Sequence, residues 1–434
     1  MIRSLVYAAC LACVATAGAF AEEQHWTGKL AREGDTFSIH VYVKEDGADR
    51  RGHLNLPDVH LFGVPLIDAD AGREGVRLGF GGDSVDFWIE GTIDGDTFTG
   101  TYTYVPQNFA ATFTLKATDD PRPYATEEVT FANDDVTLAG TVFRPNTPGP
   151  HPGIVLIHGS GDNERWWRFG HADFFARQGF VVLAFDKRGN GGSTGNWRLV
   201  GFEPLARDGL AGLLLLQSRP DVDPKRVGFW GISQAGWIMP LAASIAPDDV
   251  AFIVTTSGAT VSVAEEVKFD YIVRLRDAGY PADVIERADH ILNLDHRVTM
   301  TGEGYDELRE LVKAAREEPW WRTFEYSLTP ARARAFPRLI EGFDPRSILE
   351  EIDTPILWMY GEEDKSVEPS KSIAILNEIM AADPKPWTIK TFPRADHGLR
   401  VPPDPNAPFP LRNYAPGHWE TIAAWLRENV LAGT

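Results

Sequence analysis

Six short apolar runs in the second part of this chain most strongly limit how it can fold. Apolar residues dominate these runs, and helical patterns such as residues 205–218 and 369–382 lie between them. The runs are residues 153–159, 180–186, 226–232, 251–258, 355–361 and 387–393. Continuous apolar strands are typical of a parallel sheet covered by helices on both faces. The alternation therefore predicts a doubly wound α/β domain.

The first part of the chain has a different pattern, in which apolar and polar residues alternate between turns rich in Gly and Asp. The dipeptide Asp94-Gly95 separates two such runs, which is a strong signal for a β-hairpin. We therefore expect an all-β domain over residues 22–118, built as a small, mostly antiparallel barrel or sandwich. The charged, Pro-containing stretch 119–128 is predicted to be a linker, and residues 129–434 to form the α/β domain.

One long segment of the α/β domain contains no apolar strand run. Residues 261–347 instead show charged helical patterns, which predict a helical insertion between two strands of the sheet. This insertion is either a peripheral subdomain or a cap over a site. The pairs Trp320-Trp321 and Trp166-Trp167 are candidate walls of an apolar pocket beneath such a cap.

Residues 1–21 have the layout of a secretory signal peptide. Arg3 precedes an apolar run, and Ala19-Phe20-Ala21 forms an Ala-x-Ala cleavage site. The run is too short and too rich in Ala for a membrane span, so we expect an exported, periplasmic or extracellular protein without stable membrane insertion. The two cysteines of the chain, Cys10 and Cys13, both lie in this segment. The mature protein would then have neither disulfides nor a cysteine nucleophile.

Composition and short motifs argue against nucleic acid, metal and cofactor as ligands of this chain. A hydrophobic fraction of 43% suffices for a sizeable core, and the formal net charge of −20 with no basic stretch makes nucleic acid an improbable partner. We expect no metal, because the best candidate cluster of His and Asp residues, residues 289–296, has the pattern of a charged helix surface. We also expect no cofactor, because the Gly-rich stretch 189–195 lacks the Lys-Ser/Thr ending of a phosphate-binding loop.

Two serines compete for the role of a nucleophile. Ser233 lies between a strand run and a helical pattern, as required for a sharp turn that exposes a reactive hydroxyl at a helix N-terminus. The Gly-x-Ser-x-Gly pattern fails there only at Ala235, so we expect strand and helix to leave room for one methyl group. Ser193 matches the pattern by its letters, but no helix follows it. We therefore assign Ser193 to a structural turn.

A serine nucleophile needs a base, and the base needs a third group to orient it. Asp364 follows the run 355–361, and His397 follows the run 387–393. Both side chains would emerge with Ser233 at the C-terminal edge of the sheet, where ligands bind in α/β proteins. We therefore predict Asp364 as the orienting acid and His397 as the base.

Other residues compete for these roles less well. Glu362 and Glu363 could supply the acid, whereas Asp396 is too close to His397 in sequence to orient its ring. Three further histidines read as surface residues of helices: His290, His296 and His418.

The segment His-Gly-Ser-Gly, residues 158–161, follows a buried strand and suits the binding of a developing oxyanion. Donors for that oxyanion are predicted to be the backbone N–H groups of Ser160 and of Gln234, the residue after the nucleophile. His158 itself is predicted to hydrogen-bond loop backbone.

The motifs HGSG, GISQAG, GEED and DHG, in this order, resemble the α/β-hydrolase superfamily, and the stretch after Phe185 is similar to secreted bacterial esterases and serine aminopeptidase-like hydrolases. The resemblance covers about residues 127–431. It implies an α/β-hydrolase fold with Ser233, Asp364 and His397 in the roles given above, and some esterases of this group also carry a small β-rich domain. Ala235 is the departure from the pattern.

These features together predict an exported serine hydrolase that cleaves carboxylic esters of small molecules through an acyl-enzyme. One alternative is a peptidase that holds the amine of a short peptide with a carboxylate pair such as Glu265-Glu266. The other is a non-catalytic ligand-binding protein on the same scaffold.

Overall fold

The described residues form two compact units, and the first gives way to the second between residues 119 and 122 of the sequence. The computed structural model describes residues 24–46, 49–72, 75–82, 84–119, 122–324, 340–403 and 413–432. The predicted signal peptide, residues 1–21, lies outside this part of the chain and stays a prediction.

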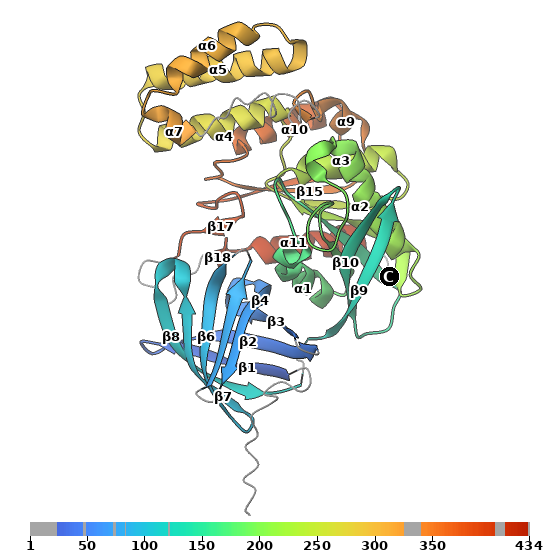
Figure 1. Ribbon diagram of the computed structural model, residues 1–434. Helices are drawn as coiled ribbons and strands as arrows, with labels where there is room; N and C mark the ends of the chain where they lie inside the picture. Colours follow the sequence, from blue (N-terminus) through green and yellow to red (C-terminus); the bar gives the residue numbers. More distant parts are fainter. Residues whose placement is uncertain are drawn as a thin grey trace, which may run out of the picture. The chain divides into compact units, whose positions relative to one another are not determined.

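The first unit is a closed antiparallel barrel of eight strands (Figure 1), because β1 pairs with both β2 and β8. The predicted all-β domain is thus a barrel and not a sandwich. The expected hairpin at Asp94-Gly95 is present, with Asp94 paired to Thr97 and Gly95 at a φ of 59°. The strands are β1 (Gln24–Arg32), β2 (Asp35–Asp46), β3 (Asp49–Leu56), β4 (Leu61–Gly72), β5 (Gly75–Gly81), β6 (Val85–Asp94), β7 (Thr97–Tyr104) and β8 (Phe109–Ala117).

The second unit is built on an eight-stranded sheet of order β16-β15-β14-β13-β11-β12-β10-β9. Neighbours from β12 to β16 are parallel, whereas β10 pairs antiparallel with both β9 and β12. The strands are β9 (Tyr124–Asn133), β10 (Val136–Pro145), β11 (His151–Ile157), β12 (Val181–Phe185), β13 (Val222–Ile232), β14 (Ile253–Thr256), β15 (Ile356–Gly361) and β16 (Trp387–Phe392), followed by a small β17–β18 ribbon (Arg400–Val401 and Asn413–Tyr414).

The predicted linker 119–128 differs from the structure in its second half. Strand β9 begins at Tyr124, because it pairs with β10 along its whole length from Tyr124 opposite Pro145 to Asn133 opposite Val136. The charged residues Glu127 and Glu128, read as linker in the sequence, are therefore part of an edge strand.

Helices cover both faces of the sheet, and each face has its own apolar core. On β11, Val155 and Ile157 join the core formed with α2, α3, α9 and α10, whereas Ile154 and Leu156 join the core formed with α1 and α11. This confirms the predicted doubly wound α/β-hydrolase fold. The helices are α1 (Phe169–Arg177), α2 (Phe202–Gln217), α3 (Ala235–Ile245), α9 (Arg346–Glu351), α10 (Pro369–Ala382) and α11 (His418–Leu426).

The predicted helical insertion lies between β14 and β15 and has a separate core. Its helices are α4 (Val263–Asp277), α5 (Ala282–Thr301), α6 (Tyr305–Ala315) and α7 (Trp320–Phe324). They enclose buried residues such as Leu275, Ile291, Leu308 and Trp320. The insertion can therefore hold its shape by packing within itself.

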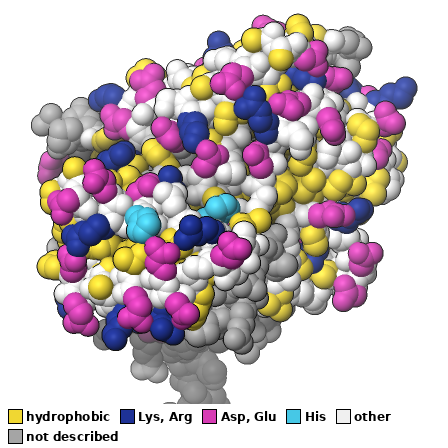
Figure 2. All heavy atoms as spheres, turned by 90° about the horizontal axis from the view of Figure 1, so that it is seen from above, with side chains coloured by type: hydrophobic (Ala, Val, Ile, Leu, Met, Phe, Trp, Pro, Cys, Tyr) yellow, Lys and Arg dark blue, Asp and Glu magenta, His cyan; other side chains and the backbone are white. Residues whose placement is uncertain are grey.

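Acidic and basic side chains are mixed on the face seen in Figure 2, with hydrophobic and neutral groups between them. On the insertion, Arg287 pairs with Glu318 and Arg297 with Glu307. His290 and His296 are partly exposed there, beside Glu307 and Glu341, as expected for surface residues. Among the helices that the structure describes, none has the length and apolar character needed to cross a membrane.

Candidate active site

Ser233 occupies a strained turn between β13 and α3. Its φ of 58° lies in the left-handed region, which is costly for a residue with a side chain. Two backbone hydrogen bonds hold the turn: the Ser233 N–H donates to the Thr256 carbonyl at 3.0 Å, and the Gly236 N–H donates to the Ser233 carbonyl at 2.8 Å. This is the geometry predicted for a serine displayed at a strand-to-helix elbow.

Ala235 fits this elbow as the sequence predicted. Its side chain is fully buried, and a methyl group added to Gly231 would lie only 2.4 Å from the Ala235 Cβ. The next residue, Gly236, is equally confined, since a methyl group there would lie 2.5 Å from the Cα of Gly258. The strand and the helix thus leave room for one methyl group, and Ala235 supplies it.

The close contact at the elbow predicts a compensating pair of substitutions. Gly231→Ala should destabilise the protein by about 1–3 kcal/mol, because the new methyl group overlaps that of Ala235. Adding Ala235→Gly should recover part of that loss, since it removes the other methyl group. Urea denaturation of both variants checks this, with Ala235→Gly alone as the control. A double variant no more stable than Gly231→Ala would contradict the proposed overlap.

His397 and Asp364 contact one another directly. The Nδ1 atom of His397 lies 2.9 Å and 3.0 Å from the two carboxylate oxygens of Asp364. Asp364 is buried, and its Oδ1 also accepts hydrogen bonds from the N–H groups of Ser366 and Val367. The carboxylate is thereby fixed, and it orients the imidazole ring. The competing acids Glu362 and Glu363 are exposed. Asp396 accepts hydrogen bonds from the backbone N–H groups of Gly398 and Arg400 in its own turn.

The environment of His397 raises the pKa of its imidazole above the usual value. Burial alone would lower this pKa, but the hydrogen bond and charge of Asp364 raise it, helped by the charges of Glu266 and Asp396. Negative groups thus stabilise the protonated ring. That is the state a base reaches after it takes a proton.

Ser160 lies in the loop after β11, and Gln234 follows Ser233 at the start of α3. Among the hydrogen bonds of the described residues, neither of these backbone N–H groups donates to an acceptor within the protein. His158 is buried, and its Nε2 lies 2.6 Å from the Phe185 carbonyl. Burial lowers the pKa of His158 to about 3, so the ring is neutral and supports the loop, as expected.

A cavity of about 630 Å³ brings these groups together. Ser160, Ser233 and His397 line it, with Asp364 behind His397. Gln234 is buried beside Ser233 at the start of α3. The structure therefore gathers all five residues singled out in the sequence.

The cavity also contains charged residues from helix α4 that the sequence did not fully identify. Glu266 and Asp270, one helical turn apart, line it together with Arg274, which forms an ion pair with Asp270. Glu265, the other member of the predicted carboxylate pair, instead caps α4 with Ser262 and binds Lys371. The pair facing the cavity is therefore Glu266–Asp270, and the i, i+4 spacing of a helix was the signal for it.

Burial strongly affects Glu266. It raises the pKa of this carboxyl to about 8, with the charges of Asp270 and Asp364 adding to the shift and His397 opposing it. The titrations of Glu266 and His397 are therefore coupled, because a protonated, cationic ring at His397 favours the ionised carboxylate of Glu266 and that carboxylate favours the protonated ring. A cation bound beside Glu266 would favour the ionised form.

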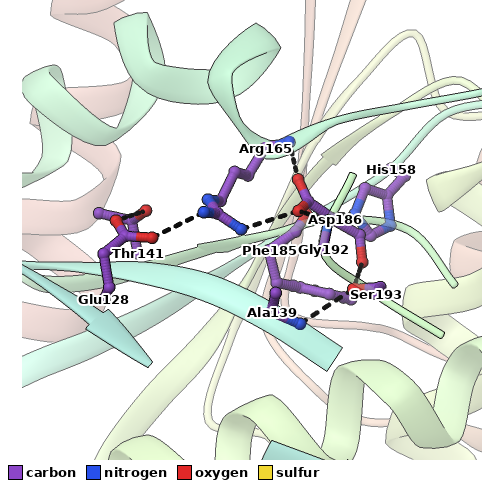
Figure 3. Close-up of polar contacts among 9 residues, drawn as sticks. All are labelled: Glu128, Ala139, Thr141, His158, Arg165, Phe185, Asp186, Gly192 and Ser193. Atoms are coloured by element: carbon purple, nitrogen blue, oxygen red, sulfur yellow. Dashed lines mark hydrogen bonds and ion pairs between the residues drawn. The ribbon is translucent and has the colours of Figure 1, made fainter. Parts of the chain in front are cut away.

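Ser193 has a structural role, as its glycine-rich surroundings suggested (Figure 3). Its Oγ donates to the Asp186 carbonyl at 2.7 Å and accepts the Ala139 N–H at 2.9 Å. Asp186 in turn accepts hydrogen bonds from Arg165 and Gly192. Ser193 thus ties its loop to strand β10, and it does not line the cavity.

Two expectations about aromatic and histidine residues need correction. Trp167 lines the cavity, but Trp320 is buried in the core of the insertion, where it packs on Trp321 and Phe324. The predicted wall from Trp320-Trp321 is therefore wrong. His418 is fully buried and stacks on Tyr414, so its assignment to the surface was also wrong.

No group of three potential metal ligands occurs in the part of the chain that the structure describes.

Several proteins are similar to parts of this chain. The quorum-quenching protein AidA of Acinetobacter baumannii is 34% identical over 26% of this chain and 38% of its own length. The uncharacterized peptidase YtmA of Bacillus subtilis is 24% identical over 61% of this chain and 84% of its own length. Esterase EstD of Thermotoga maritima is 26% identical over 60% of this chain and 57% of its own length. The chain thus spans less than two thirds of AidA and of EstD.

Family assignment rests on a longer match. Residues 134–396, more than half of the chain, match the X-Pro dipeptidyl-peptidase (S15) family. This region runs from the β9–β10 turn to the residue before His397, and it contains the elbow at Ser233, the loop of Ser160 and the insertion. The chain belongs to the X-Pro dipeptidyl-peptidase (S15) family.

Proposed function

We propose that this protein is a serine hydrolase that cleaves carboxylic esters. The observation that carries the proposal is the cavity that both the strained Ser233 and the Asp364-oriented His397 line. Such a constellation activates a hydroxyl that is otherwise a weak nucleophile. The similarity to EstD supports an ester as the substrate.

The proposed reaction follows from the roles of these groups. The Ser233 Oγ attacks the ester carbonyl carbon while His397 takes the hydroxyl proton, and the N–H groups of Ser160 and Gln234 receive the negative charge on the oxygen. His397 then returns the proton to the departing alcohol, which leaves an acyl-enzyme. Water, deprotonated by His397, attacks the acyl carbon, and the acid is released as Ser233 regains its proton.

The proposal is tested by comparing ester and amide substrates. Purified protein would be assayed on p-nitrophenyl esters of varied chain length and on aminoacyl p-nitroanilides, with Ser233→Ala as the control. Ester turnover that is abolished by the substitution is expected. Faster turnover of the anilides would overturn the choice of ester.

A second candidate function is a peptidase that recognises a substrate amine. Glu266 and Asp270 favour it, because two carboxylates facing the same cavity as Ser233 could hold a cationic group. The similarity to YtmA agrees with this alternative. A preference for aminoacyl anilides that disappears in Glu266→Gln would support it.

Glu266 also predicts a change in pH dependence. The acidic limb of kcat/KM reports the pKa of free His397, because the base must be neutral to act. This limb should lie above the ordinary pKa of 6.5, since the pKa of His397 is raised. In Glu266→Gln one cause of that rise is lost, so the limb should move to lower pH.

The neighbouring residue provides a matched control for this measurement. Glu265→Gln removes a carboxylate from the same helix, but one bound to Ser262 and Lys371 and not among the causes of the His397 shift. Its pH profile should match that of the wild type. An unchanged limb in Glu266→Gln, or an equal shift in Glu265→Gln, would refute the assignment.

A further inference from the structure

Lys187 is a buried lysine in the loop after β12. It is 1% exposed, and its Nζ donates to the carbonyls of Gly159 at 2.9 Å and Gly161 at 3.1 Å and to the side-chain oxygen of Gln234 at 3.1 Å. An ammonium group has three N–H donors, so every donor of Lys187 has an acceptor. The side chain is therefore fixed in one geometry.

The three acceptors belong to two segments, the loop after β11 and the start of α3. Gly159 and Gly161 enclose Ser160, and Gln234 follows Ser233 at the start of α3. These segments carry the two N–H groups that the proposed mechanism directs at the oxyanion. One ammonium group thus connects both halves of the predicted oxyanion hole.

We propose that Lys187 is a positioning residue that holds the N–H groups of Ser160 and Gln234 at the separation that binding of the oxyanion requires. The inference rests on the proposed function of Ser233. Oxyanion donors are effective because they are placed before the reaction, and small displacements of reacting groups lower rates severely.

The neighbouring cations show that an ion pair does not account for the burial of Lys187. Arg188, the next residue, binds Asp208, and Arg165 binds Asp186. Lys187 forms no such pair with any carboxylate among the described residues, and its contacts are neutral oxygens.

Burying an unpaired charge is costly, and its effect is visible in the pKa of Lys187. Burial lowers it to about 7; the charge of Asp162 opposes this shift, and Arg168 and Arg198 add to it. The Trp197 ring, 4.4 Å from Nζ, compensates part of the cost. A negative charge that develops on a substrate in the neighbouring cavity would stabilise the ammonium group. The free-energy cost of burying Lys187 would then be offset in part during the reaction.

The experiment is the substitution Lys187→Met, which keeps an unbranched stem against Trp197 and removes all three donors. Two quantities are measured: kcat and KM on a p-nitrophenyl ester, and the rate at which a fluorophosphonate labels Ser233. We expect kcat and the labelling rate each to fall about 10²-fold with little change in KM, as for loss of an oxyanion donor.

A matched control separates positioning from general stability. Arg165→Met removes ion pairs with Asp186 and Glu128 in the same region. Among the described residues, the Arg165 side chain forms no hydrogen bond to Gly159, Gly161 or Gln234. It should lower the melting temperature while kcat and the labelling rate are retained. If Lys187→Met does not fold, Lys187→Gln, which keeps an amide donor, is measured in the same way and should show a smaller loss of both rates.

The outcomes distinguish the two proposals. A wild-type protein that no fluorophosphonate labels at Ser233 contradicts the proposed function. Wild-type labelling at Ser233, with equally fast labelling and turnover in the folded Lys187 variant, overturns the role of Lys187 alone. A loss confined to KM, or a loss of rate equal to that in Arg165→Met, overturns it as well.

Discussion

Replacement of Ser233 by alanine is expected to lower kcat on ester substrates by about 10⁶-fold, because loss of the nucleophile removes the acyl-enzyme route. The fold should be retained, since alanine preserves the backbone hydrogen bonds to Thr256 and from Gly236. Steady-state kinetics and circular dichroism of the purified variant check both expectations. Residual activity within a factor of ten of the wild type would exclude Ser233 as the nucleophile.

Ser193→Ala is the matched control, since this serine satisfies the literal Gly-x-Ser-x-Gly pattern. The substitution leaves the Ala139 N–H without its acceptor, so it should cost about 1–3 kcal/mol of stability. Its kcat should equal that of the wild type, because Ser193 does not line the cavity. A fluorophosphonate that labels Ser193 in the wild type would contradict this division of roles.

Asp364→Asn is expected to lower kcat by about 10⁴-fold. The amide oxygen can keep the bonds from the Ser366 and Val367 N–H groups, so the turn should remain intact. The amide nitrogen then faces the Nδ1 atom of His397 and favours the wrong tautomer of the ring. Loss of the carboxylate charge also removes a cause of the raised His397 pKa, so the acidic limb of kcat/KM should move to lower pH.

The exposed neighbours provide the control for this second prediction. Glu362→Gln and Glu363→Gln each remove a carboxylate from the same loop without touching His397. Their rates and pH profiles should be those of the wild type. A large loss of kcat in either of them, with only a small loss in Asp364→Asn, would reassign the acid.

The elements of the site that were predictable share a local signal. The elbow at Ser233 is predicted by a strand run, a small residue and the helical pattern that follows. Ala235 also indicated how closely the strand and the helix pack. Asp364 and His397 follow strands that the sequence predicts, residues 355–361 and 387–393. Chain order and the common edge of a parallel sheet then brought these residues together.

The remaining elements depend on packing between distant segments. Lys187 stands in a loop, and its contacts are with carbonyls 26 and 28 residues away and with Gln234. His418 looked like a surface residue at a helix start, but Tyr414 and Phe392 bury it. No periodicity in the sequence reports such contacts.

The insertion between β14 and β15 has a consequence for how chains of this kind can diverge. Most of its buried residues pack on a core of their own, and β14 pairs directly with β15. Mutations can therefore replace α4 and the carboxylates it directs at the cavity while the strands carrying Ser233, Asp364 and His397 stay unchanged. Selection for a new substrate would then act on one exchangeable stretch of the gene, and the machinery for bond cleavage would be inherited intact.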